Sequence, residues 1–128
     1  MHRSLTFLLA TCSISVCAAT TVDSFETTYA KAQANALTER GAAYDTELGT
    51  AFENMPEFRA KVTNCLEANP GPHSVRGYFL FLSPKDFQVV LEPRDSFSFC
   101  LSQALASPSL PAPPEVPYLN PFTFSTQP

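Results

Sequence analysis

The chain has 128 residues, with 8 lysines and arginines against 12 aspartates and glutamates, and a formal net charge of −4. This acidic balance argues against nucleic acid or an anionic membrane as a partner, because both recruit clustered lysine and arginine. The length suits one domain of ordinary size rather than two.

The first 19 residues have the pattern of a signal peptide. Arg3 precedes an uncharged stretch that runs from residue 4 to residue 22 and has an apolar middle. Small residues around Ala18 suit cleavage, so the mature chain is expected to begin near Ala19 or Thr20. The alternative is an uncleaved anchor, since the stretch could just cross a bilayer, but its many serines and threonines disfavour this. We therefore expect a periplasmic or secreted protein.

The cysteines predict one disulfide. Cys12 and Cys17 lie in the predicted signal peptide, which leaves Cys65 and Cys100 as an even pair in a chain bound for an oxidising compartment. Closing a loop of this size stabilises a domain by roughly 3 to 4 kcal/mol, mainly through the unfolded state. A metal site would need further ligands, and a redox site usually has its two cysteines separated by two residues, so both alternatives are weaker.

Residues 20–54 are expected to form an N-terminal helical region. From Asp23 onward the segment is rich in alanine, glutamate and threonine and has no proline, and Asp23 or Ser24 can cap its start. Gly41 marks the predicted kink or turn between two helices. The apolar side chains recur at helical spacing and are interpreted as core: Phe25, Tyr29, Ala32, Ala36, Tyr44, Leu48 and Phe52.

Residues 55–128 are expected to form an α+β domain. A helix that starts near Pro56 carries Cys65 on its apolar face and ends at the Asn-Pro-Gly-Pro segment 69–72. Apolar runs at 75–82 and 87–92 flank a Ser-Pro-Lys-Asp turn, which predicts a β-hairpin. The first run is apolar on both faces, so this strand is central in the sheet or its outer face meets another surface.

The remaining elements are a helix, a connector and a strand. Asp95 or Ser96 opens a short helix that has Cys100 on its apolar stripe. Residues 107–121 hold six prolines and are interpreted as an ordered connector rather than a ligand for an aromatic groove. Residues 122–125 form the last strand. The predicted fold is α+β, with N-terminal helices followed by a small antiparallel three-stranded sheet in helix-strand-strand-helix-strand order.

Short motifs follow one another between residues 62 and 125. They are Val-Thr-Asn-Cys-Leu-Glu from 62, Val-Arg-Gly-Tyr-Phe-Leu-Phe from 75, Ser-Phe-Cys-Leu-Ser-Gln-Ala-Leu from 98, Leu-Pro-Ala-Pro from 110 and Pro-Phe-Thr-Phe from 121. Together they resemble the C-terminal domain of TonB-like proteins, most closely the cysteine-containing branch of AgmX-type envelope proteins. The resemblance implies a sheet that recruits an extended partner segment. The chain differs from that family in its hairpin turn, which is commonly Asp-Gly there, and in lacking a long proline-rich spacer.

No group of residues points to catalysis. His73 is the one histidine outside the predicted signal peptide, and a lone loop histidine without a nucleophile or metal ligands beside it is usually solvent-exposed. Helical carboxylate pairs such as Glu53 and Glu57 suit a solvated surface, and the four glycines form no phosphate-binding loop. We therefore expect a protein that is not an enzyme and has no metal or cofactor.

The expected function is binding of a protein partner in the bacterial cell envelope. The terminal strand can leave backbone groups unpaired along an edge, and such edges accept an extended segment by strand addition. The expected contact residues are Tyr78, Leu80, Leu82, Phe122, Thr123 and Phe124. The alternative for these residues is that the strand is paired or covered and that they belong to the core. A second functional hypothesis is an inhibitor or immunity-type protein that blocks an exported enzyme with a loop, either 70–74 or the proline-rich stretch.

Overall fold

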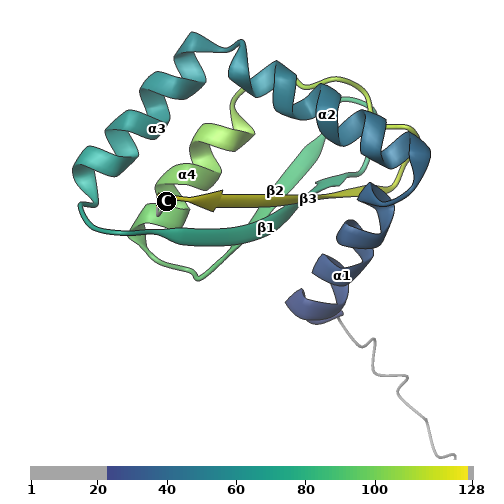
Figure 1. Ribbon diagram of the computed structural model, residues 1–128, viewed down its shortest axis with the longest axis horizontal. Coiled ribbons are helices and arrows are strands. Elements are labelled where there is room, and N and C mark those ends of the chain that lie inside the picture. Colours follow the sequence, from purple (N-terminus) through teal and green to yellow (C-terminus); the bar gives the residue numbers. More distant parts are fainter. Residues whose placement is uncertain (1–22, 127–128) are drawn as a thin grey trace, which may run out of the picture.

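The computed structural model describes residues 23–126 and shows an α+β fold (Figure 1). Its elements are α1 (Phe25–Ala36), α2 (Glu39–Glu53), α3 (Pro56–Ala68), β1 (Ser74–Phe81), β2 (Phe87–Glu92), α4 (Ser96–Ala106) and β3 (Tyr118–Ser125). The predicted class and order of elements are confirmed. The predicted signal peptide, residues 1–19, lies outside the described residues. Between residues 23 and 126 no helix is long and apolar enough to cross a membrane.

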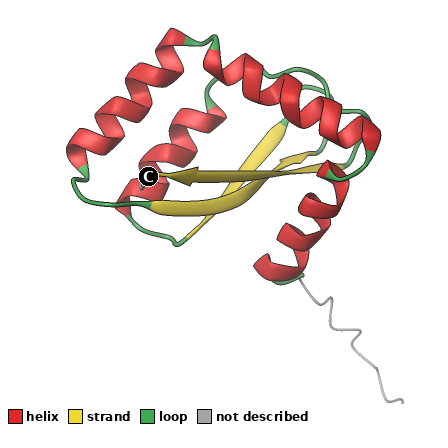
Figure 2. Ribbon diagram, in the orientation of Figure 1, coloured by secondary structure: helices red, strands yellow, loops and turns green. Residues whose placement is uncertain are grey.

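The three strands form one antiparallel sheet in the order β2-β1-β3, so β1 is central and the other two strands are edges. Phe79 of β1 lies opposite Val89 of β2 and Asn120 of β3. Because side chains alternate along a strand, Phe79 and Phe81 face one side of the sheet and Tyr78 faces the other. In Figure 2 the strands lie between α2 and α3 on one side and α1 on the other.

The main core lies between the Phe79 face of the sheet and helices α2, α3 and α4. Its fully buried side chains include Phe79 and Phe81 from β1, and Phe97, Leu101 and Leu105 from α4. Burying each side chain of this size contributes about 1.5 to 3 kcal/mol. The aromatic side chains of β1 therefore fix which face of the sheet the three helices cover.

Helix α1 covers the opposite face of the sheet. Tyr29 and Ala32 of α1 are buried against Tyr78, and Phe25 packs beside them. The Arg76 guanidinium lies 5.3 Å from the ring centre of Phe25 and 5.2 Å from that of Tyr29, within cation–π range. This packing explains why β1 is apolar on both faces, since the strand is central and its outer face also meets a helix.

The turn between α1 and α2 lies at residues 37–38 and not at Gly41. Thr38 caps α2 by accepting a hydrogen bond from the Gly41 backbone N–H at 3.0 Å. Gly41 lies in the first turn of α2, where an added Cβ would overlap the carbonyl oxygen of Asn35. The glycine is therefore needed for the close approach of the two helices and not for the reversal of the chain.

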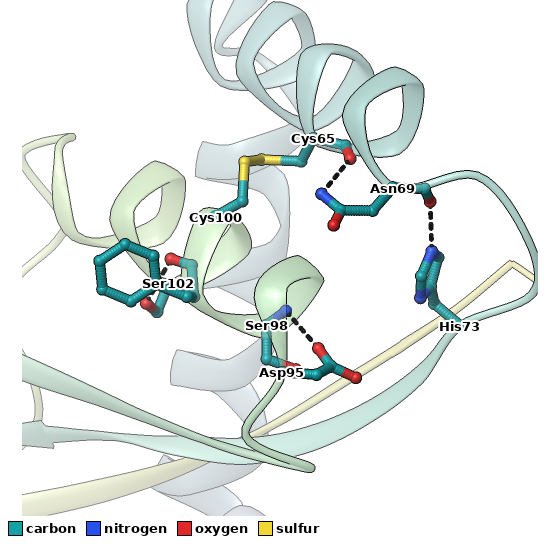
Figure 3. Close-up of a disulfide and its surroundings, with 8 residues drawn as sticks. Cys65, Asn69, His73, Asp95, Ser98, Cys100 and Ser102 are labelled. Atoms are coloured by element: carbon teal, nitrogen blue, oxygen red, sulfur yellow. Dashed lines mark hydrogen bonds between the residues drawn. A yellow bond between two sulfur atoms is a disulfide. The ribbon is translucent and has the colours of Figure 1, made fainter.

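The predicted disulfide is confirmed, and Figure 3 shows it joining two helices. Cys65 of α3 and Cys100 of α4 are bonded, with their Cα atoms 5.7 Å apart. Of the residues in α3, Cys65 is the one that is fully buried. The disulfide therefore joins α3 to the rest of the domain through the most buried residue of this helix.

The proline-rich connector is held against α2. The Tyr44 hydroxyl donates a hydrogen bond to the carbonyl oxygen of Pro111, and the Arg40 guanidinium donates one to that of Pro114, both at 2.9 Å. The last strand begins at Tyr118, four residues earlier than predicted, so β3 includes Pro121. A proline is tolerated there because β3 is an edge strand.

Candidate partner-binding site

The hydrogen-bond pattern of an antiparallel sheet determines which backbone groups of an edge strand face outward. Along each strand, alternate residues bond to the neighbouring strand and the residues between them point away from it. The Thr126 N–H donates to the carbonyl oxygen of His73 at 3.0 Å, continuing the register of β1 with β3. Even-numbered residues of β3 therefore bond to β1, and the backbone groups of Leu119, Pro121, Thr123 and Ser125 face outward.

Most of the outward-facing edge of β3 is occupied. The Asn35 side chain donates to the carbonyl oxygen of Leu119 at 3.0 Å, and the Asn120 side chain donates to that of Pro121 at 3.1 Å. Pro121 has no N–H to offer, and proline on an edge strand is a common protection against unwanted pairing. Thr123 is exposed. Among Leu119, Pro121 and Thr123, the predicted edge thus offers an added strand one unobstructed residue.

The edge of β2 is more open. The Leu82 N–H donates to the carbonyl oxygen of Asp86 at 3.0 Å, continuing the register of β1 with β2. Even-numbered residues of β2 therefore bond to β1, and the backbone groups of Phe87, Val89 and Leu91 face outward. Within the described part of the chain, none of these outward groups has another hydrogen-bond partner. Phe87 and Val89 are partly exposed, whereas Leu91 is buried, so two alternate residues of β2 can accept an added strand.

A groove of about 410 Å³ runs between β2 and α4. Residues 89–91 form one wall, and the other wall includes Ser98, Phe99 and Ser102, which with Asp95 follow the i, i+3, i+4, i+7 spacing of one helix face. Phe99 is 67% exposed as a residue, whereas the buried face of α4 carries Phe97 and Leu101. The groove therefore combines an open strand edge with an exposed aromatic side chain.

The two charged residues at the end of this groove differ in whether they have a partner. Asp95 caps α4 by accepting a hydrogen bond from the Ser98 backbone N–H at 2.8 Å, which lowers the pKa of that carboxyl group (Figure 3). Arg94 lines the same groove and has no ion-pair or hydrogen-bond partner among residues 23–126. The groove thus contains one carboxylate, Asp95, that already accepts a hydrogen bond and one guanidinium, Arg94, that has no partner within that range.

The structure places the predicted contact residues on different surfaces. Tyr78 and Leu80 lie on the face covered by α1, and Leu82 is exposed at the start of the hairpin turn. Phe122 and Phe124 pack against the main core on the other face of the sheet. These residues do not form one binding surface, and Thr123 remains as the predicted residue at the edge itself.

The β2 edge and Phe99 were not predicted from the sequence. A signal for Phe99 exists, because this aromatic residue falls outside the apolar stripe formed by Phe97, Cys100 and Leu101 on the same helix. The open edge of β2 gives no such signal, since it depends on the order of strands in the sheet.

His73 is part of the packing around the disulfide rather than a solvent-exposed loop residue. Its ring stacks on Phe97 with the ring centres 3.9 Å apart, and its Nε2 is 2.6 Å from the carbonyl oxygen of Asn69. The Asn69 side chain in turn donates to the carbonyl oxygen of Cys65. Among residues 23–126 no group of three or more His, Cys, Asp or Glu is placed to hold a metal ion.

No family model, curated protein or solved structure matches this chain. The resemblance to TonB-like C-terminal domains stays a prediction.

Proposed function

We propose that this chain is a non-catalytic, exported protein-binding module of the bacterial cell envelope. It binds an extended segment of a partner protein by adding that segment as a further strand to its sheet. The observation that carries the proposal is the three-stranded sheet with two edges, one of which presents three outward-facing residues in succession. Strand addition uses such backbone groups for affinity and neighbouring side chains for specificity.

The test removes outward-facing N–H groups from both edges at once. A double variant carrying Val89→Pro and Thr123→Pro loses one such group on each edge, and neither N–H bonds to β1. Pro121 already occupies an equivalent position in β3, so the sheet should tolerate both changes. The matched control carries Val89→Thr and Thr123→Val, which keep both N–H groups and nearly the same side-chain shape.

The measurement is recovery of cross-linked partners from a periplasmic or secreted fraction, with folding checked by circular dichroism. A partner strand on either edge loses one backbone hydrogen bond worth about 1 to 1.5 kcal/mol, so we expect the proline variant to lose about five- to tenfold in recovery while the control retains it. Equal recovery by the two variants, with native spectra, would show that the protein does not bind through a sheet edge.

A further inference from the structure

We propose that the groove between β2 and α4 is the docking site and that it takes an extended peptide segment of another protein carrying apolar residues and an acidic group. This inference rests on the proposed strand addition and names its edge and its class of ligand. Three features of the groove carry it: the free backbone edge of β2, the exposed Phe99 and the unpaired Arg94.

The backbone edge requires an extended ligand. Phe87 and Val89 offer alternate N–H and C=O groups along one line, and only a chain in β conformation can match that spacing. By contrast, the outward groups of β3 are interrupted at Leu119 and Pro121. The two edges of the sheet thus differ in their capacity for pairing, and β2 has the greater capacity.

The helix side of the groove requires apolar side chains in the ligand. Side chains of an added strand alternate between the two faces of the sheet, and those on the α4 side come to lie beside Phe99. Covering this exposed ring removes apolar surface from water, which favours binding.

The charges favour an acidic ligand. Arg94 has no partner among residues 23–126, and the neighbouring Asp95 is engaged by the backbone N–H of Ser98. A guanidinium group pairs well with a carboxylate because the two groups match in shape and charge. An aspartate, a glutamate or a terminal carboxylate at this end of the ligand therefore complements the groove.

A second copy of this chain is a poorer occupant. In a symmetric dimer, β2 would pair antiparallel with β2 of a second copy, with the two Val89 residues opposite each other. This arrangement places Asp86 of each copy opposite Glu92 of the other. Like charges directly opposite one another destabilise a strand pair. The edge is therefore better suited to a different protein than to formation of a symmetric dimer.

The first experiment selects linear peptides from a displayed random library on the full, disulfide-bonded chain and measures their affinities for variants. We expect selected peptides to alternate apolar residues and to carry a carboxylate. Val89→Pro should weaken their binding about tenfold, and Arg94→Gln about fivefold at low salt, whereas Thr123→Pro, on the opposite edge of the sheet, leaves it unchanged. A peptide with alternate N-methylated amides should lose binding to the unaltered protein, which tests the backbone pairing even where a variant fails to fold.

The outcomes separate the docking site from strand addition in general. Loss of binding with Thr123→Pro, but not with Val89→Pro, would overturn the β2 site and leave strand addition in place at β3. Peptides insensitive to both proline changes and to N-methylation, or a library that gives no linear binder, would overturn the β2 site and the strand-addition mode together. Changes in the amide NMR signals of Phe87, Val89 and Leu91 on peptide addition would support the β2 docking site.

Discussion

At the scale of single residues, two glycines of α2 have opposite environments. A Cβ at Gly41 would overlap the carbonyl oxygen of Asn35, whereas nothing lies within 4 Å of a Cβ at Gly49. Gly41→Ala should therefore lower the free energy of unfolding by about 1 to 3 kcal/mol, as overpacking does. Gly49→Ala should raise it by roughly 0.5 to 1 kcal/mol through better helix propensity. Urea unfolding of both variants checks the pair, and equal effects would contradict the tight contact between α1 and α2.

The Asp95 cap at the start of α4 makes the free energy of unfolding depend on pH. The Ser98 backbone N–H bonds to its carboxylate and lowers its pKa in the folded state. A lowered folded pKa means that the carboxylate stabilises the fold above its unfolded pKa of about 3.9 and that this stability is lost as pH falls through the folded value. Asp95→Asn keeps a capping oxygen but does not titrate, so its unfolding free energy should fall less than that of the wild type between about pH 5 and pH 2. Parallel curves for the two proteins would contradict this coupling.

At the scale of elements, local signals predicted helix starts well. Ser24 and Asp95 accept the expected capping hydrogen bonds, and Pro56 occupies the first turn of α3. These features depend on a few adjacent residues. The start of β3 was misplaced because prolines suggested a connector, whereas an edge strand tolerates Pro121.

The candidate site was harder to predict than the helices because it depends on contacts between distant segments. Alternation along a strand separates Tyr78 from Phe79 on the two faces of β1, but it does not specify that α1 covers the Tyr78 face. Likewise, two hydrogen bonds from side chains, Asn35 to Leu119 and Asn120 to Pro121, occupy the β3 edge. Such partners are set by tertiary packing, so the choice between the two edges required the structure.

Helix α1 is the element that we expect to unfold locally most readily. Its buried side chains are Tyr29 and Ala32, which pack in a cluster separate from the main core. Tyr29→Ala removes the larger of them and costs about 3 kcal/mol or more of packing. We expect hydrogen exchange of α1 amides to accelerate at least about tenfold while α4 is unchanged. Gln33→Ala, at an exposed position of the same helix, is the control, and acceleration spread evenly over all helices would contradict a separately packed α1.

At the scale of the whole molecule, the disulfide joins a weakly buried helix to a deeply buried one. Cys65 is the fully buried residue of α3, whereas α4 also buries Phe97 and Leu101. Replacing both cysteines by serine should lower the free energy of unfolding by about 3 kcal/mol, as loss of a native disulfide in a small domain does. Chemical denaturation of the double variant beside the wild type measures this loss.

The loss of stability should be distributed unevenly between the two helices. Because α4 retains its own packing against β2 and the main core, hydrogen exchange in the double cysteine variant should accelerate more in α3 than in α4. The groove between β2 and α4 should then still bind its peptide at a temperature where the variant remains folded, since neither cysteine lines it. Equal acceleration in both helices, or loss of peptide binding by a folded variant, would show that the disulfide positions α4 and with it the docking site.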